Sequence, residues 1–130
     1  KILQAIRSYK LIKGLICFSP LAQGLLSDRY LDGIPEDSRI KKDGRFLKAD
    51  RLTDNRLKSI RRLNELAKRR GQKLAEMALA WILRDGVAAS VLIGASKPEQ
   101  ILDNIKAIEN TDFTEDEIRE IDDCKTRAEA

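Results

Sequence analysis

The sequence predicts an α/β fold with a parallel sheet. Two short, continuous apolar runs, residues 15–18 and 91–93, are typical of strands that are buried on both faces. Amphipathic helical patterns lie between these runs and after them. Two such strands separated by helices pair in parallel through a crossover. Because two strands alone do not make a stable parallel sheet, we expect further strands from another chain or from a part of the protein outside these residues.

The elements follow from local signals along the chain. Residues 1–13 have a helical pattern that Gly14 ends, and residues 21–30 suggest a loop with a short helical turn. Residues 31–52 form a long, basic loop, of a length that is often functional in a compact domain. Lys1 lies inside a helical pattern without a signal peptide or an initiator methionine, so we expect the chain to begin within a larger protein.

Capping signals define the helices that follow. Thr53 is placed to cap a helix that Gly71 ends, and residues 73–84 predict a second helix, apolar nearly all round and therefore well buried. Residues 96–99 have the form of a capping box that opens a helix after the second strand. A further capping box, residues 114–117, opens the last helix.

Composition indicates one globular domain, which we place over residues 1–130. The apolar fraction is 42% and the charged fraction 35%, which is not a disordered composition. The net charge of +4 is too small to indicate nucleic acid as a partner, and it suits a small anionic ligand equally well. No apolar run approaches the roughly 20 residues of a membrane span, so we expect no membrane partner.

The cysteine and histidine counts restrict the chemistry further. The two cysteines, Cys17 and Cys124, form no Cys-x-x-Cys motif, and the chain has no histidine. These counts argue against a metal site, a disulfide framework and a Ser-His or Cys-His nucleophile. They favour a reducing compartment, which we take to be the cytoplasm.

Each predicted strand runs into a loop of small residues. The first loop is residues 19–24, and the second is residues 94–96, directly before a helix. In parallel α/β folds the carboxyl ends of the strands form the ligand face, and free amides at a helix N-terminus bind phosphate. Arg29, Arg39 and Lys97 supply positive charge nearby. Taken separately, each loop also fits a plain turn or a helix cap without a ligand.

Taken together, the two loops resemble a known family. Phe18-Ser19-Pro20-Leu21-Ala22-Gln23-Gly24-Leu25-Leu26, then Asp28-Arg29-Tyr30, looks like the loop after strand seven of the aldo-keto reductases. Val91-Leu92-Ile93-Gly94-Ala95-Ser96, then Glu99-Gln100 and Asp103-Asn104, looks like strand eight and the cofactor helix. The resemblance covers roughly residues 15–123 and points to the group that includes bacterial glyceraldehyde-3-phosphate/methylglyoxal reductases and potassium-channel β subunits.

The resemblance implies a (β/α)8 TIM barrel that binds NADP(H), of which this chain holds strands seven and eight with their helices. By resemblance, the first loop contacts the pyrophosphate, and Phe18 lies near the nicotinamide. The second loop holds the adenosine 2′-phosphate with its ribose, and the helix after it contacts the adenine. The implied cofactor-binding residues are Phe18, Ser19, Pro20, Leu21, Ala22, Gly24, Arg29, Arg39, Gly94, Ser96, Gln100, Asp103 and Asn104.

The resemblance also implies what these residues lack. The family reduces aldehydes and ketones by hydride transfer, with a tyrosine as proton donor supported by an aspartate, a lysine and a histidine on earlier strands. None of the four matches a position here, so no catalytic residue is assigned, and we expect the chain alone to be inactive. A whole barrel takes about 250 residues. Without the N-terminal part of the barrel, we expect exposed apolar faces, and aggregation or homo-oligomers.

Two other readings stay open at the level of sequence. One is a non-catalytic interaction module, similar to channel β subunits that use a reductase barrel as a redox-sensing partner. The other is a basic helical domain that binds nucleic acid through residues 56–70. Against the second reading, those basic residues flank an ordinary amphipathic stripe with few aromatic side chains to stack on bases.

Overall fold

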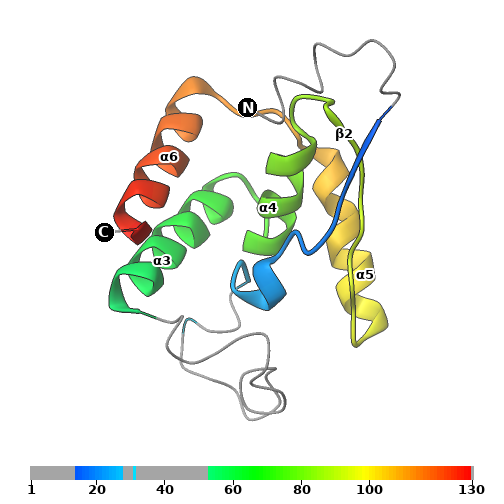
Figure 1. Cartoon of the computed structure of the whole chain (residues 1–130), viewed down its shortest axis with the longest axis horizontal. Coiled ribbons are helices and arrows are strands. Elements are labelled where there is room, and N and C mark those ends of the chain that lie inside the picture. The colour runs from blue at the N-terminus through cyan, green and yellow to red at the C-terminus, as the bar shows by residue number, and fades with distance from the viewer. Residues whose placement is uncertain (1–13, 28–30, 32–52, 130) are drawn as a thin grey trace.

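The computed structural model describes residues 14–27, 31 and 53–129 (Figure 1). The predicted helix over residues 1–13, and the predicted loop over residues 31–52 apart from Leu31, lie outside the described residues. The described elements are β1 (Leu15–Cys17), the 3-10 turn η1 (Ala22–Gly24), α3 (Asp54–Arg69), α4 (Leu74–Leu83), β2 (Ala88–Val91), α5 (Pro98–Ile105), the 3-10 turn η4 (Lys106–Glu109) and α6 (Glu115–Glu129).

The two strands pair in parallel, as the sequence predicts. The predicted position of the second strand was wrong, because β2 covers Ala88–Val91 rather than residues 91–93. The ladder continues one step past β2, where the Leu92 N–H donates to the Cys17 carbonyl at 2.8 Å. A strand extends only as far as its partner, and β1 ends at Cys17, so Ile93 has no neighbouring strand among the described residues.

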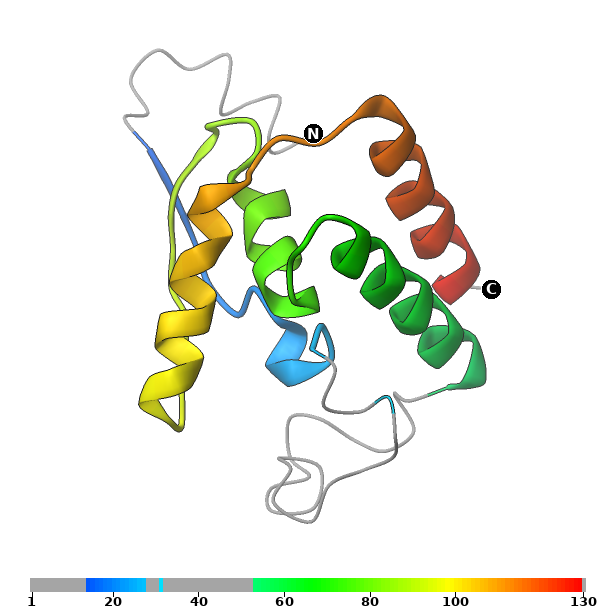
Figure 2. The same cartoon turned by 180° about the vertical axis from the view of Figure 1, so that it is seen from behind.

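The strands are not buried on both faces in the part of the chain that the structure describes, and the exposed apolar face agrees with what we expect of these strands without the rest of a barrel. One face of the sheet carries Ile16, Phe18 and Leu92, which are 62%, 79% and 60% exposed. Helix α5 lies on one side of the two strands, behind them in Figure 1 and in front of them in Figure 2. A second layer that would cover the other face is not among the described residues.

The first long helix, α3, is bounded by local signals that confirm the prediction. Thr53 is its N-cap, and the Thr53 hydroxyl oxygen accepts a hydrogen bond from the Arg56 N–H at 3.3 Å. After Arg69 the chain turns at Gly71, whose φ of +70° lies in the left-handed region that glycine adopts without strain. Helix α6 lies beside α3 (Figures 1 and 2).

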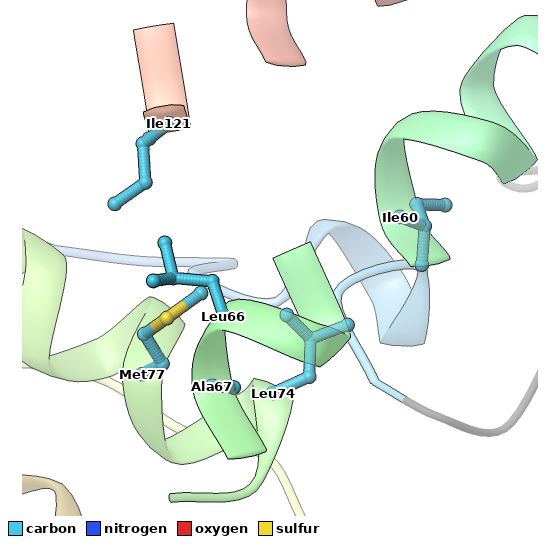
Figure 3. Close-up of a cluster of buried hydrophobic side chains, with 6 residues drawn as sticks. All are labelled: Ile60, Leu66, Ala67, Leu74, Met77 and Ile121. Carbon is cyan, nitrogen blue, oxygen red and sulfur yellow. The ribbon is translucent and has the colours of Figure 1, made fainter. Parts of the chain in front are cut away.

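Helix α4 lies in the centre and is well buried, as predicted. Leu74, Met77, Leu79 and Ala80 are all at most 3% exposed. The apolar core joins three helices and is drawn in Figure 3; it consists of Ile60, Leu66 and Ala67 from α3, Leu74 and Met77 from α4, and Ile121 from α6. The core therefore lies between helices, to one side of the sheet.

The predicted capping box before α6 is confirmed. The Glu117 N–H donates to the Thr114 hydroxyl at 3.2 Å, and the Thr114 N–H donates to the Glu117 carboxylate at 2.9 Å. The same carboxylate forms an ion pair with Arg70 at 2.7 Å, and the Arg70 side chain is only 4% exposed. The start of α6 is thus tied to the end of α3.

Candidate functional site

The two small-residue loops lie at the same end of the sheet. In a parallel pair the carboxyl ends of both strands meet at one edge, and here Cys17 is aligned with Val91. Strand β1 ends at Cys17, shortly before the first loop, and β2 ends at Val91, shortly before the second loop. The structure therefore brings the two predicted parts of the site to one edge, as the sequence argument requires (Figures 1 and 2).

The first loop is a compact series of turns. The N–H groups of Ala22 and Gly24 donate to the carbonyls of Ser19 and Leu21 at 3.2 and 2.9 Å. Ser19 and Ala22 have φ values of +53° and +46°, a region that costs a residue with a side chain roughly 1–2 kcal/mol. Strain of this kind is often found in ligand-binding loops.

The remaining predicted residues of this loop differ in exposure. Phe18 is 79% exposed, and Ser19 is also exposed, whereas Pro20 and Leu21 are half-buried. The amides of Ala22 and Gly24 are used inside the loop, so its outer surface consists of side chains and of carbonyl groups rather than of those two donors. Arg29 and Arg39 lie outside the described residues.

The second loop ends in a small set of converging donors. The Gln100 side-chain oxygen accepts hydrogen bonds from the Ser96 N–H at 2.8 Å, the Ser96 hydroxyl at 3.2 Å and the Lys97 N–H at 3.3 Å. The predicted capping box at residues 96–99 was wrong by one residue. Helix α5 begins at Pro98 with Lys97 as N-cap, so Gln100 rather than Glu99 stands at the third helical position and reaches back.

The other predicted residues on this side are Gly94, Asp103 and Asn104. Gly94 is exposed, and no other atom lies within 4 Å of where a Cβ would be, so the space beside it is open. Asn104 is buried, with 8% of its surface exposed, so its side-chain amide lies beneath the surface of α5.

Asp103 is held by two lysines that the sequence reasoning did not include. Its two carboxylate oxygens accept from Lys73 at 2.5 Å and from Lys106 at 3.3 Å. These hydrogen bonds, first that of Lys73, hold the pKa of Asp103 below its ordinary value. The Lys106 contact could have been suspected from its i, i+3 spacing. The Lys73 contact spans 30 residues, and no local pattern indicates it.

The lowered pKa of Asp103 predicts a pH dependence of stability. Since the folded-state pKa lies below the unfolded value, the stabilisation is present above about pH 3.8 and is lost as the pH falls through the folded-state pKa. Urea unfolding of the wild type and of Asp103→Asn at about pH 6 and about pH 3 measures it. We expect the difference in unfolding free energy between the two proteins to shrink at the lower pH. A difference that stays constant or grows in acid would contradict the role of the two lysines.

Two features are absent from the described part of the chain. No group of three histidine, cysteine or carboxylate side chains comes together there as potential metal ligands. No helix among the described residues is both long and apolar enough to cross a membrane.

Comparison with known proteins identifies the family of the chain. The model of the aldo/keto reductase family matches residues 5–126, which include both loops and helix α5. The chain belongs to the aldo/keto reductase family. It is 50% identical over 112 residues to L-glyceraldehyde 3-phosphate reductase of Escherichia coli, both in strain K12 and in O157:H7. It is 36% identical over 125 residues to a Schizosaccharomyces pombe protein assigned as a voltage-gated potassium channel subunit beta.

These relatives are longer proteins. The matches cover 84% of this chain and 32% of the Escherichia coli reductases, and 93% of this chain and 35% of the Schizosaccharomyces pombe protein. The chain thus spans about a third of the length of the curated relatives it matches. The resemblance to the aldo-keto reductases, and to the group with these two kinds of member, is confirmed.

Proposed function

We propose that the natural protein containing this chain is an NADP(H)-dependent reductase of aldehydes or ketones with a (β/α)8 barrel. In this proposal the chain contributes the last two strands and much of the cofactor pocket. The two parallel strands joined through helices support the barrel, and the family match supports the activity. NADPH, when bound, supplies the hydride for carbonyl reduction.

The observation that carries the cofactor assignment is the donor set at the start of α5. Three donors from Ser96 and Lys97 converge on one oxygen, that of Gln100. Donors that satisfy a carboxamide oxygen suit a phosphate oxygen, and a helix N-terminus favours negative charge. The residues therefore fit a phosphate group. Ser96 and Lys97 would hold it, and Gln100 would release these donors to the ligand.

The open space beside Gly94 and the exposed side chain of Phe18 give the rest of the dinucleotide room along the same edge. By the family resemblance, Ser19, Pro20, Leu21, Ala22 and Gly24 would line this space from the first loop and Asp103 from α5, and the buried side chain of Asn104 would contact the cofactor from below the helix surface. We propose Arg29 and Arg39 as further anion contacts on the strength of the family resemblance. The substrate class is a small aldehyde, since an Escherichia coli relative is an L-glyceraldehyde 3-phosphate reductase.

The 130 residues contain no histidine, and we propose that they do not catalyse the reduction by themselves. The catalytic groups would come from the part of the barrel that this chain does not include, which is then its most important partner. A cytoplasmic location fits a protein whose two cysteines have no disulfide pattern.

A titration with NADPH tests the donor set. We expect Ser96→Ala in the natural full-length protein to weaken NADPH binding about tenfold, the effect of one lost hydrogen bond to a charged group. Ser96→Asp, which places a carboxylate among the donors, should weaken it by at least about a hundredfold. Fluorescence of NADPH reports the dissociation constants. The matched control is Ser90→Ala, at an exposed serine on β2 outside the loop.

The outcomes separate clearly. Saturable NADPH binding that Ser96→Asp leaves unchanged would remove this loop from the cofactor site. Absence of any NADPH binding by the wild type would reject the cofactor assignment as a whole.

A second function, that of a non-catalytic channel subunit, is favoured by the relative at 36% identity. NADPH-dependent reduction of small aldehydes by the natural protein distinguishes the two. The reductase proposal expects turnover, and the channel-subunit alternative expects NADPH binding without turnover.

A further inference from the structure

The ion-pair cluster on α5 lies close to the proposed phosphate donors. Asp103 stands three residues after Gln100, so the two side chains are neighbours on one face of the helix. Gln100 in turn touches both donors of Ser96. An unpaired carboxylate at residue 103 would therefore present a negative charge within about one helical turn of the donor set.

Two lysines pair with Asp103 and make the net charge of this cluster positive. The Nζ of Lys73 lies 2.5 Å from one oxygen of Asp103, and the Nζ of Lys106 lies 3.3 Å from the other. The carboxylate of Asp103 and the two ammonium groups together carry one net positive charge. The side chain of Asp103 is 32% exposed, whereas those of Lys73 and Lys106 are 61% and 54% exposed. The ammonium groups of Lys73 and Lys106 are thus more exposed to solvent than the Asp103 carboxylate with which they pair.

The two lysines come from different parts of the fold. Lys106 follows Asp103 at the end of α5, whereas Lys73 is the N-cap residue of α4. The Lys73 pair therefore ties the start of the central helix to α5, at a residue three positions after Gln100 on that helix. Because α4 is buried and well packed, the backbone at Lys73 is held in place, and its side chain extends from there into solvent to reach Asp103.

We propose that Lys73 and Lys106 are specificity-determining residues that favour a dinucleotide with a phosphate on its adenosine ribose over one without it. They act as positioning residues by neutralising Asp103 and by leaving one positive charge beside the proposed phosphate donors. The inference rests on the proposed function and extends it, because it assigns the choice between the two forms of the cofactor to side chains outside the loops.

The test compares two nucleotides in the natural full-length protein. Dissociation constants of NADPH and NADH are measured by fluorescence for the wild type, Lys73→Met and Lys73→Arg. We expect Lys73→Met to weaken NADPH binding about three- to tenfold and to change NADH binding less than about twofold, the range of a single charge acting through solvent. Lys73→Arg keeps the charge and should retain most of the preference.

A control variant and a series of salt concentrations show whether the effect of Lys73→Met on nucleotide binding comes from its local charge. Lys58→Met changes the net charge equally on the exposed side of α3 and should leave both dissociation constants unchanged. The effect of Lys73→Met on NADPH should also shrink at high ionic strength. A merely structural role of Lys73 would weaken both nucleotides alike.

Equal weakening of NADPH and NADH, or no change in either, overturns this inference and leaves the proposed function in place. Binding of neither nucleotide by the wild type overturns the proposed function and this inference with it.

Discussion

Arg70→Met is expected to lower the free energy of unfolding by about 3 kcal/mol, because it removes one partner of a buried ion pair. The Arg70 guanidinium is 2.7 Å from the Glu117 carboxylate, with the arginine side chain 4% exposed. It also donates to the Asp112 carbonyl at 2.8 Å and to the Gln72 side-chain oxygen at 2.9 Å. Its Cζ lies 3.8 Å from the centre of the Phe113 ring.

All these contacts lie at the junction between α3 and α6. Arg70 joins the end of α3 to the segment that leads into α6, and Glu117 belongs to the capping box of α6. Methionine fills much of the same volume, but it removes the donor to the Asp112 carbonyl and to the Gln72 side-chain oxygen, and it removes the cationic partner of Glu117. Urea unfolding of the natural protein measures the change.

Arg69→Met is the matched control. The neighbouring residue carries the same side chain and pairs with Glu120 at 2.6 Å, but the side chain of Arg69 is 58% exposed. Exposed pairs contribute about 0–1 kcal/mol, so we expect a loss below about 1 kcal/mol. Equal losses from both substitutions would show that burial does not set the strength of the Arg70 contacts.

The contrast between these two arginines also shows where sequence reasoning succeeds and fails. The caps at Thr53 and Thr114 and the turn at Gly71 were predictable because each depends on residues within one or two turns of the helix. The partner of Arg70 lies 47 residues away, and no pattern in the chain distinguishes Arg70 from Arg69.

The second strand illustrates the same limit in the sheet. The apolar run at residues 91–93 correctly indicates a strand in this region, but hydrogen bonds to β1 decide which residues are paired. The register irregularity between Leu15 and Ile16 shifts that pairing further. Strand boundaries are properties of two segments, whereas the apolar pattern belongs to one.

The candidate site, too, was predictable from the sequence only in part. Small residues after both strands, and a serine before a helix, were sufficient to predict that the two loops lie at one end of the sheet. The individual cofactor-binding residues come from the family resemblance and stay a prediction. The pattern did not reveal that Gln100 gathers the donors of Ser96 and Lys97, because side-chain conformation decides that contact. It also did not reveal that Lys73 reaches Asp103, because α4 and α5 meet only in the folded chain.

Leu66→Ala is expected to lower the free energy of unfolding by about 3 kcal/mol. Leu66 is 2% exposed and belongs to the core cluster between α3, α4 and α6 (Figure 3). Removal of the isobutyl group leaves a cavity lined by residues of three helices, which relax only in part. Urea unfolding of the natural protein again gives the value.

Leu102→Ala is the instructive comparison, because it removes the same atoms from α5. Within the described residues Leu102 is 64% exposed, and that exposure alone predicts a loss below about 0.5 kcal/mol. The proposed barrel predicts more. Ile101, Leu102, Ile105 and Ile108 are all exposed along α5 and η4, and Ile16, Phe18 and Leu92 are exposed on the strands, an apolar surface that a completed barrel would cover.

We therefore expect Leu102→Ala to cost more than about 1 kcal/mol in the natural protein, less than Leu66→Ala but more than a solvent-exposed leucine. A loss below about 0.5 kcal/mol would mean that this face of α5 stays in contact with water, and it would count against the barrel. The expectation for Leu66 does not depend on the barrel, since the core cluster that surrounds it is formed by described residues of α3, α4 and α6. The pair of leucines thus separates the stability of the helical core from the completion of the fold around it.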